Sequence, residues 1–184
     1  MTRLASSDSA STSTAIMHGS LGSPTGWDDV RFQRLWLATQ KREWGSLAVL
    51  SASSSIATLH IAEMLAQLAW RYRGQPSSVF DLRDLSMRLV DYQVRELHAH
   101  VEGGTRVLIA LRSIFENPTA IPIAQQADAV VLCIALGETD FKGAEQTIAE
   151  VGRDRVIGAI VMRPGERGSK KKNGAAGAPG SPER

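Results

Sequence analysis

The chain has 184 residues, of which 43% are hydrophobic and 22% are charged, the composition of a globular domain rather than of a fibrous or disordered protein. This length suffices for one domain of ordinary size but not for two independent cores. The net charge of +2 comes from the last twenty residues, which hold five basic and two acidic side chains, so that residues 1–164 sum to −1. This charge balance predicts no nucleic-acid partner.

Both ends of the sequence are poor in large apolar side chains. Residues 1–26 are dominated by Ser, Thr, Ala and Gly, and residues 165–184 by Gly, Ala, Pro and Lys. Neither segment can bury enough apolar surface to offset the chain entropy lost on folding, so both are predicted to be disordered. The tail contains Lys170, Lys171 and Lys172, which we interpret as a solvated run that anchors only weakly to anionic lipid.

The folded domain is therefore expected over residues 27–164, where helical and strand patterns alternate. In chain order, the pattern predicts a helix over 27–41, a strand over 46–51, a helix over 56–70, a short strand over 78–80, a long helix over 82–101, strands over 106–111 and 129–135, a helix over 140–151 and a last strand over 156–162. Strands that are apolar throughout and separated by helices predict a parallel sheet covered on both faces. The predicted fold class is α/β, with three α/β/α layers and a mostly parallel sheet.

No apolar run approaches the ~20 residues that a membrane span needs. The N-terminus has no apolar region of the kind that marks a signal peptide. The sequence therefore predicts a cytoplasmic protein. Its single cysteine, Cys133, lies inside an apolar run, so it is expected in the core and argues against a disulfide framework or a multi-thiolate metal site.

The segment Ser51–Ala66 (SASSSIATLHIAEMLA) joins a predicted strand to a predicted helix through small residues. It resembles the loop of the P-loop ATPases related to ParA and MinD, and most of all that of the cytoplasmic bacterial tyrosine-kinase domains that accompany polysaccharide co-polymerases. In that family the segment reads approximately S-A-x-P-G-E-G-K-S-T-x-A-x-N-L-A. Later segments, Ala127–Leu132, Gly137–Thr139 and Arg155–Val161, also resemble the family's scaffold. The resemblance implies a P-loop NTPase-like fold.

The centre of this loop departs from the family pattern. Thr58 stands where the family has its phosphate-binding lysine, and Leu59 where it has a hydroxyl that holds Mg²⁺. Glycines let backbone N–H groups surround the phosphates and lysine neutralises them, so a functional site is not expected here. The degenerate loop comprises Ser53, Ser54, Ser55, Ala57, Thr58 and Leu59. We expect no cofactor and no metal, while the sequence leaves residual binding of ATP or ADP with Mg²⁺ open.

The acidic motifs that the resemblance implies are also altered. Asp81, in the sequence VFDLR, retains the end of the family's D-x-D-L-R motif and is a candidate remnant magnesium ligand, although we favour a carboxylate that caps a helix. Ala110 replaces the carboxylate of the third motif. The only tyrosines, Tyr72 and Tyr92, do not form the C-terminal cluster that these kinases phosphorylate. The resemblance thus implies a pseudo-kinase with no catalytic residues.

Other patterns admit a structural interpretation. Ser53, Ser54 and Ser55 precede a predicted helix without a placed His or Asp partner, which favours helix capping over a nucleophile. His98 and His100 are two apart in a predicted helix, so their side chains point about 200° apart and do not chelate one metal ion.

Tryptophan and arginine gather around the first predicted helix. Trp27, Arg31, Arg34, Trp36 and Trp44 are candidates for a partner interface, because these residue types are enriched at interface hot spots. The alternative is that Trp36 docks this helix onto the sheet, and the two interpretations are weighted about equally.

From the resemblance we expect a non-enzymatic cytoplasmic accessory of exopolysaccharide or capsule biosynthesis and export. Its partner would be a membrane polysaccharide co-polymerase, or chain-length determinant, which would hold it peripherally at the inner membrane; homo-oligomers are also left open. One alternative is a divergent active ATPase or tyrosine autokinase that neutralises phosphates with Arg73, Arg83 or Arg112. The other is a ParA- or MinD-like positioning factor.

Overall fold

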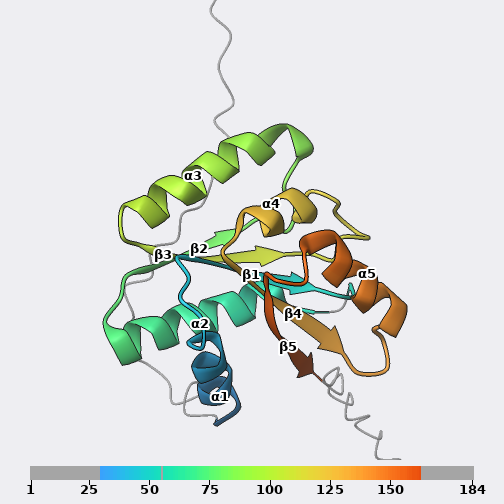
Figure 1. Ribbon diagram of the computed structural model, residues 1–184, viewed down its shortest axis with the longest axis horizontal. Coiled ribbons are helices and arrows are strands. Elements are labelled where there is room, and N and C mark those ends of the chain that lie inside the picture. Colours follow the sequence, from blue (N-terminus) through green and yellow to red (C-terminus); the bar gives the residue numbers. More distant parts are fainter. Residues whose placement is uncertain (1–29, 55, 163–184) are drawn as a thin grey trace, which may run out of the picture.

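A five-stranded parallel sheet forms the centre of the molecule (Figure 1). The computed structural model describes residues 30–54 and 56–162, so the segments 1–26 and 165–184, predicted to be disordered, lie outside the described residues. The strands are β1 (Ser46–Ser51), β2 (Ser77–Asp81), β3 (Arg106–Leu111), β4 (Ala129–Ala135) and β5 (Val156–Met162). Their order across the sheet is β2-β3-β1-β4-β5, and every neighbouring pair is parallel.

Helices cover both faces of this sheet (Figure 1). One face carries α1 (Val30–Thr39) and α2 (Thr58–Arg73), and the other carries α3 (Val90–Glu102), α4 (Ala120–Gln126) and α5 (Phe141–Val151). Right-handed crossovers explain why α2 lies on one face and α3, α4 and α5 on the other. The connection from β1 to β2 runs across the sheet in one direction, and all later strand-to-strand connections run in the other. The predicted three-layer α/β/α class is confirmed, and it is consistent with the P-loop-like architecture that the resemblance implies.

The sheet separates two apolar clusters. Ile109, on β3, packs toward α3 and α4, whereas the next residue back, Leu108, packs toward α1 and α2. Both side chains are fully buried, as are the residues on either side of them in the strand. Alternate residues of a strand point to opposite faces, so a strand covered on both faces has to be apolar throughout.

Helix α2 begins and ends differently from what the sequence predicts. It starts after Ala57, whose side chain offers no capping bond, so the predicted serine cap is wrong for the described residues of that loop. It extends three residues beyond the predicted end, to Arg73. Gly74 then adopts a left-handed conformation with φ of 61°, and its N–H donates to the carbonyl oxygen of Trp70 at 2.8 Å.

The helix predicted over 82–101 is shorter than expected. A 3₁₀ turn covers Met87–Leu89 and the α-helix begins only at Val90. Leu82 instead continues from β2, and its N–H donates to the carbonyl oxygen of Ala110 at 3.1 Å. The predicted cap role of Asp81 is therefore wrong, because no helix starts next to it.

No helix within residues 30–54 and 56–162 is long and apolar enough to cross a membrane.

Candidate functional site

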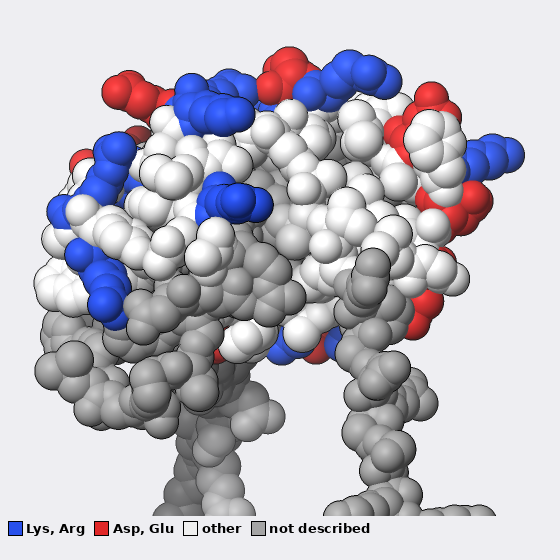
Figure 2. Space-filling view, turned by 90° about the horizontal axis from the view of Figure 1, so that it is seen from below, with Lys and Arg blue, Asp and Glu red and all other residues white. Residues whose placement is uncertain are grey.

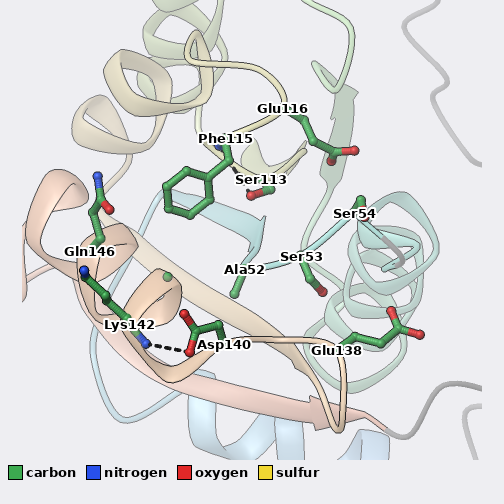
Figure 3. Close-up of a pocket in the computed structure, with 11 residues that line it drawn as sticks. Ala52, Ser53, Ser54, Ser113, Phe115, Glu116, Glu138, Asp140, Lys142 and Gln146 are labelled. Carbon is green, nitrogen blue, oxygen red and sulfur yellow. Dashed lines mark hydrogen bonds between the residues drawn. The ribbon is translucent and has the colours of Figure 1, made fainter.

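A pocket of about 450 Å³ lies at the carboxyl-terminal edge of the sheet (Figure 3). It is lined by the loops that follow β1, β3 and β4 and by the start of α5. Its walls contain three carboxylates, one ammonium group, several hydroxyl groups and one aromatic ring: Glu116, Glu138, Asp140, Lys142, Ser53, Ser54, Ser113 and Phe115. Figure 3 shows the two serines of the β1 loop on one side of the pocket and Lys142 on the other.

The topology explains why a crevice opens at this place. The chain leaves β1 toward α2 on one face of the sheet, whereas it leaves the neighbouring strands β3 and β4 toward α4 and α5 on the other face. Adjacent loops therefore diverge, and the carboxyl edge of a parallel sheet at such a point is where α/β proteins place ligands. This is also the edge at which the loop that resembles a P-loop lies.

The loop after β1 is held by its own serines. The hydroxyl of Ser51 hydrogen-bonds to the carbonyl oxygen of Ser53, and the N–H of Ser53 donates back to Ser51 Oγ at 3.2 Å. Ala52 N–H donates to the carbonyl oxygen of Cys133 on β4 at 2.9 Å. Ser53 Oγ is buried and has no partner among the described residues, whereas Ser54 is exposed. Ser55 lies outside the described residues.

Thr58 does not face the pocket. It is fully buried, and its Oγ1 donates a hydrogen bond to the carbonyl oxygen of Leu111, the last residue of β3, at 2.9 Å. Leu59 is half-buried and packs against the apolar cluster beneath the sheet. Thr58 stands where the family has its phosphate-binding lysine, and it instead forms a main-chain hydrogen bond. Leu59 stands where the family has its magnesium-binding hydroxyl, and it instead packs in an apolar cluster.

Asp81 is committed to an ion pair. Arg83 Nε donates to Asp81 Oδ1 at 2.7 Å and Arg83 Nη2 donates to Oδ2 at 2.8 Å, so the pairing is bidentate. The bond from Arg83 lowers the pKa of Asp81 below its usual value, against the opposing effect of burial. Strand β3 separates β2 from β1, and Asp81 does not line the pocket.

The three arginines of the divergent-enzyme alternative are not gathered at the pocket. Arg83 pairs with Asp81, and Arg112 Nε lies 2.9 Å from Asp84 Oδ1 in an ion pair whose N–H does not point at the oxygen. Arg73 ends α2, at the opposite edge of the sheet.

The charges around the pocket do not suit a polyphosphate. Glu116, Glu138 and Asp140 oppose a single ammonium group, that of Lys142. Asp140 also caps α5, accepting a hydrogen bond from the backbone N–H of Lys142 at 3.4 Å. No group of three or more His, Cys, Asp or Glu side chains is placed to hold a metal ion in the part of the chain that the structure describes.

The sequence-based prediction missed most of the pocket. Glu138 lies within Gly137–Thr139, which the sequence marks only as a scaffold segment, and no motif draws attention to Glu116, Asp140 or Lys142. The available signal was positional, because residues that follow parallel strands meet at one edge of the sheet.

The candidate partner interface is in part corrected. Trp36 and Trp44 are only 3% and 5% exposed, so both belong to the core: the docking alternative is right for Trp36, and the interface prediction is wrong for Trp44. Their rings meet edge to face at 6.4 Å, and the Arg106 guanidinium lies 4.4 Å from the ring centre of Trp44. Arg34 is exposed on α1. Trp27 and the side chain of Arg31 lie outside what the structure describes.

The histidines and the cysteine have structural surroundings. The ring of His100 meets Phe80 edge to face at 5.1 Å, and its Nδ1 lies 2.9 Å from the carbonyl oxygen of Glu96. Cys133 is buried in β4, and this burial raises the pKa of its thiol to about 12.

Comparisons with known proteins give only distant structural likeness. No family model matches the sequence, and no curated protein matches it. Among solved structures, the kinase domain of the Escherichia coli tyrosine kinase ETK is similar at 12% identity and a TM-score of 0.41. The similarity covers 83% of this chain and 66% of that one, just under two thirds of its length. Likeness at this level identifies neither a family nor an activity.

Proposed function

We propose that this protein is a non-enzymatic accessory of exopolysaccharide or capsule biosynthesis and export. It acts as a pseudo-tyrosine-kinase that binds the cytoplasmic part of a membrane co-polymerase or chain-length determinant. The family part of the proposal rests on the sequence resemblance. The non-enzymatic part is carried by one observation, that Thr58, in the place of the phosphate-binding lysine, is fully buried with its hydroxyl bonded to Leu111.

Physical chemistry supports this reading of the crevice. Phosphoryl transfer depends on cations that neutralise the charge of the transferred group. The pocket has three carboxylates against one ammonium group, and the two arginines nearest in sequence to the strand ends, Arg83 and Arg112, are paired with aspartates. Ala110 offers no carboxylate for Mg²⁺ where the resemblance implies one.

The protein would therefore act through its surface. A domain whose three interior strands, β1, β3 and β4, are almost entirely buried presents a rigid outer face to a partner, and Arg34 is exposed on α1 for such a contact. Trp27 and Arg31 remain proposed contacts. A second copy of the chain is the other candidate partner.

Thermal unfolding with and without nucleotide tests the non-enzymatic part. A ligand at about 100 times its dissociation constant adds roughly 2.7 kcal/mol of stability. For a domain of this size that would raise the midpoint by roughly 5–11 °C. With millimolar Mg-ATP or Mg-ADP we expect no rise beyond that seen with MgCl₂ alone. A nucleotide-specific rise, or tyrosine phosphorylation of the purified chain by ATP, would contradict the proposal and favour the divergent enzyme.

Co-purification tests the partner. The tagged chain is expected to retain a polysaccharide co-polymerase from detergent-solubilised membranes of the source cells. Arg34→Glu is expected to weaken the retention. Arg88, which is also exposed and lies in the turn before α3, provides the control variant Arg88→Glu. Retention of partition or division proteins instead would favour the positioning factor.

A further inference from the structure

Basic side chains are in excess at one edge of the sheet and not at the other. All strands are parallel, so the residues that precede them meet at the amino-terminal edge and those that follow them meet at the carboxyl-terminal edge. The amino-terminal edge has seven basic and four acidic side chains within residues 41–44, 71–76, 102–106, 127–128 and 152–155. The carboxyl-terminal edge has four basic and five acidic ones within residues 52–54, 56–57, 81–89, 112–119 and 136–142.

The face formed by α1 and α2 shows the same division (Figure 2). Blue side chains predominate on the left, where Figure 1 places the end of α2, and red ones predominate along the right edge. The acidic residues of the amino-terminal edge are Glu43, Glu102, Asp128 and Asp154. One of them, Asp128, accepts hydrogen bonds from the N–H groups of Gly45 and Ser46.

The last turn of α2 adds two large aromatic side chains to this basic edge. Trp70 is 58% exposed and Tyr72 is 50% exposed. Residues 70 and 72 are about 200° apart around a helix, so the two rings project from different sides of its end. Arg71 and Arg73 lie between and after them and are exposed, as is Lys41 in the loop after α1.

We propose that this amino-terminal edge, with the end of α2 at its tip, docks directly on an anionic phospholipid surface. Trp and Tyr combine an apolar ring with a polar group and settle at membrane–water interfaces. Arginine and lysine extend apolar stems along such a surface while their charges meet the lipid headgroups. The charge difference then orients the molecule, since the carboxyl-terminal edge lacks the basic excess and its pocket has three carboxylates against one ammonium group, so this edge faces the solution.

Vesicle sedimentation of the full chain tests this inference without any protein partner. We expect the chain to pellet with vesicles of 70% phosphatidylcholine and 30% phosphatidylglycerol, to stay in solution with pure phosphatidylcholine, and to be released by 0.5 M salt. Each basic side chain near an anionic membrane contributes about fivefold to binding, so Lys41→Glu with Arg73→Glu is expected to weaken it at least about tenfold. Trp70→Ala with Tyr72→Ala is expected to weaken it by a similar factor.

Three controls keep the outcome specific. Phe141→Ala removes an aromatic ring that is 81% exposed at the other edge, and Arg88→Glu reverses a charge there; neither is expected to change sedimentation. Replacing Lys170, Lys171 and Lys172 by glutamine tests the basic tail, and binding is expected to persist. The inference is overturned if the tail variant alone abolishes binding, if the edge variants bind as the unchanged chain does, or if no vesicle binds. Circular dichroism and the thermal midpoint verify that each variant is folded.

Discussion

The hydroxyl of Thr58 and the main-chain carbonyl oxygen of Leu111 are 2.9 Å apart in a hydrogen bond that joins the first residue of α2 to the last residue of β3. The bond lies in a region from which solvent is excluded, since both residues are fully buried. The start of α2 is thereby attached to the carboxyl-terminal edge of the sheet. A position that resembles a ligand site in sequence serves in this chain to hold a helix in place.

Thr58→Lys is the direct test of that role. A lysine at this fully buried position brings an ammonium group away from water and removes the bond to Leu111, so we expect at least ~3 kcal/mol of destabilisation in urea unfolding. No gain of Mg-ATP binding is expected. Gln67→Lys, on the exposed side of the same helix, is the control and should stay within ~0.5 kcal/mol of the unchanged chain. Equal stability of both variants, together with nucleotide binding by Thr58→Lys, would mean that the site had room for the lysine.

Two neighbouring residues of α1 distinguish docking from an interface. Trp36 is 3% exposed and Leu37 is 66% exposed. Trp36→Ala leaves a cavity between α1 and the sheet and is expected to lower the free energy of unfolding by about 3–5 kcal/mol. Leu37→Ala is expected to change it by less than ~0.5 kcal/mol. If Trp36→Ala proved as mild as Leu37→Ala in urea unfolding, the assignment of Trp36 to the core would fail.

The strands could be predicted well because their signal is local. Four of the five have the bounds that the sequence predicts, and β2 is longer by one residue at each end. Buried parallel strands are apolar on both faces, and in this chain a charged residue, a glycine or a loop marks the ends of each apolar run. The seven-residue helix α4, by contrast, was not predicted. Its sequence, AIPIAQQ, contains a proline in the first turn, a position that a helix tolerates because that N–H has no intrahelical partner.

The start of α3 depends on contacts that no local pattern reveals. The side-chain amide of Asn117 donates to the carbonyl oxygens of Arg83 and Leu85, each at 3.1 Å and more than thirty residues away in sequence. These bonds hold the segment before Met87 in a non-helical conformation despite its helical pattern. The burial of Trp36 is likewise invisible to a local pattern, because it depends on where α1 packs. The pocket is invisible for the same reason, because its carboxylates come together only through the order of the strands in the sheet.

Asp128 gives the stability of the fold a dependence on pH. Burial raises the pKa of this carboxyl, but hydrogen bonds from the N–H groups of Ser46 and Gly45 and from the Ser46 hydroxyl outweigh it, so the pKa in the folded chain lies below the usual value. A lowered pKa contributes stability that is fully present above the unfolded value of about 4 and is lost as the pH falls through the folded value.

We therefore expect Asp128→Asn to lower the free energy of unfolding by about 1–3 kcal/mol at pH 7. The difference from the unchanged chain should shrink as the pH falls from 5 to 3, as measured by urea unfolding at each pH. Glu145→Gln, on the exposed side of α5, should change neither the stability nor its pH dependence. A constant difference between Asp128→Asn and the unchanged chain at all pH values would contradict the charged state assigned to Asp128.

The burial of Cys133 predicts how fast its thiol reacts in the folded chain. Burial raises the pKa of its thiol to about 12, and only the thiolate reacts with disulfide reagents. At pH 8 the native chain should therefore react at least about a thousandfold more slowly than the chain unfolded in guanidinium. Gln67→Cys with Cys133→Ala places the only thiol on the exposed side of α2 and should react rapidly when folded. Because the sequence has a single cysteine, the signal in each chain has one source. Native Cys133 labelling at the rate of the exposed cysteine would mean that β4 opens far more often than a buried interior strand should.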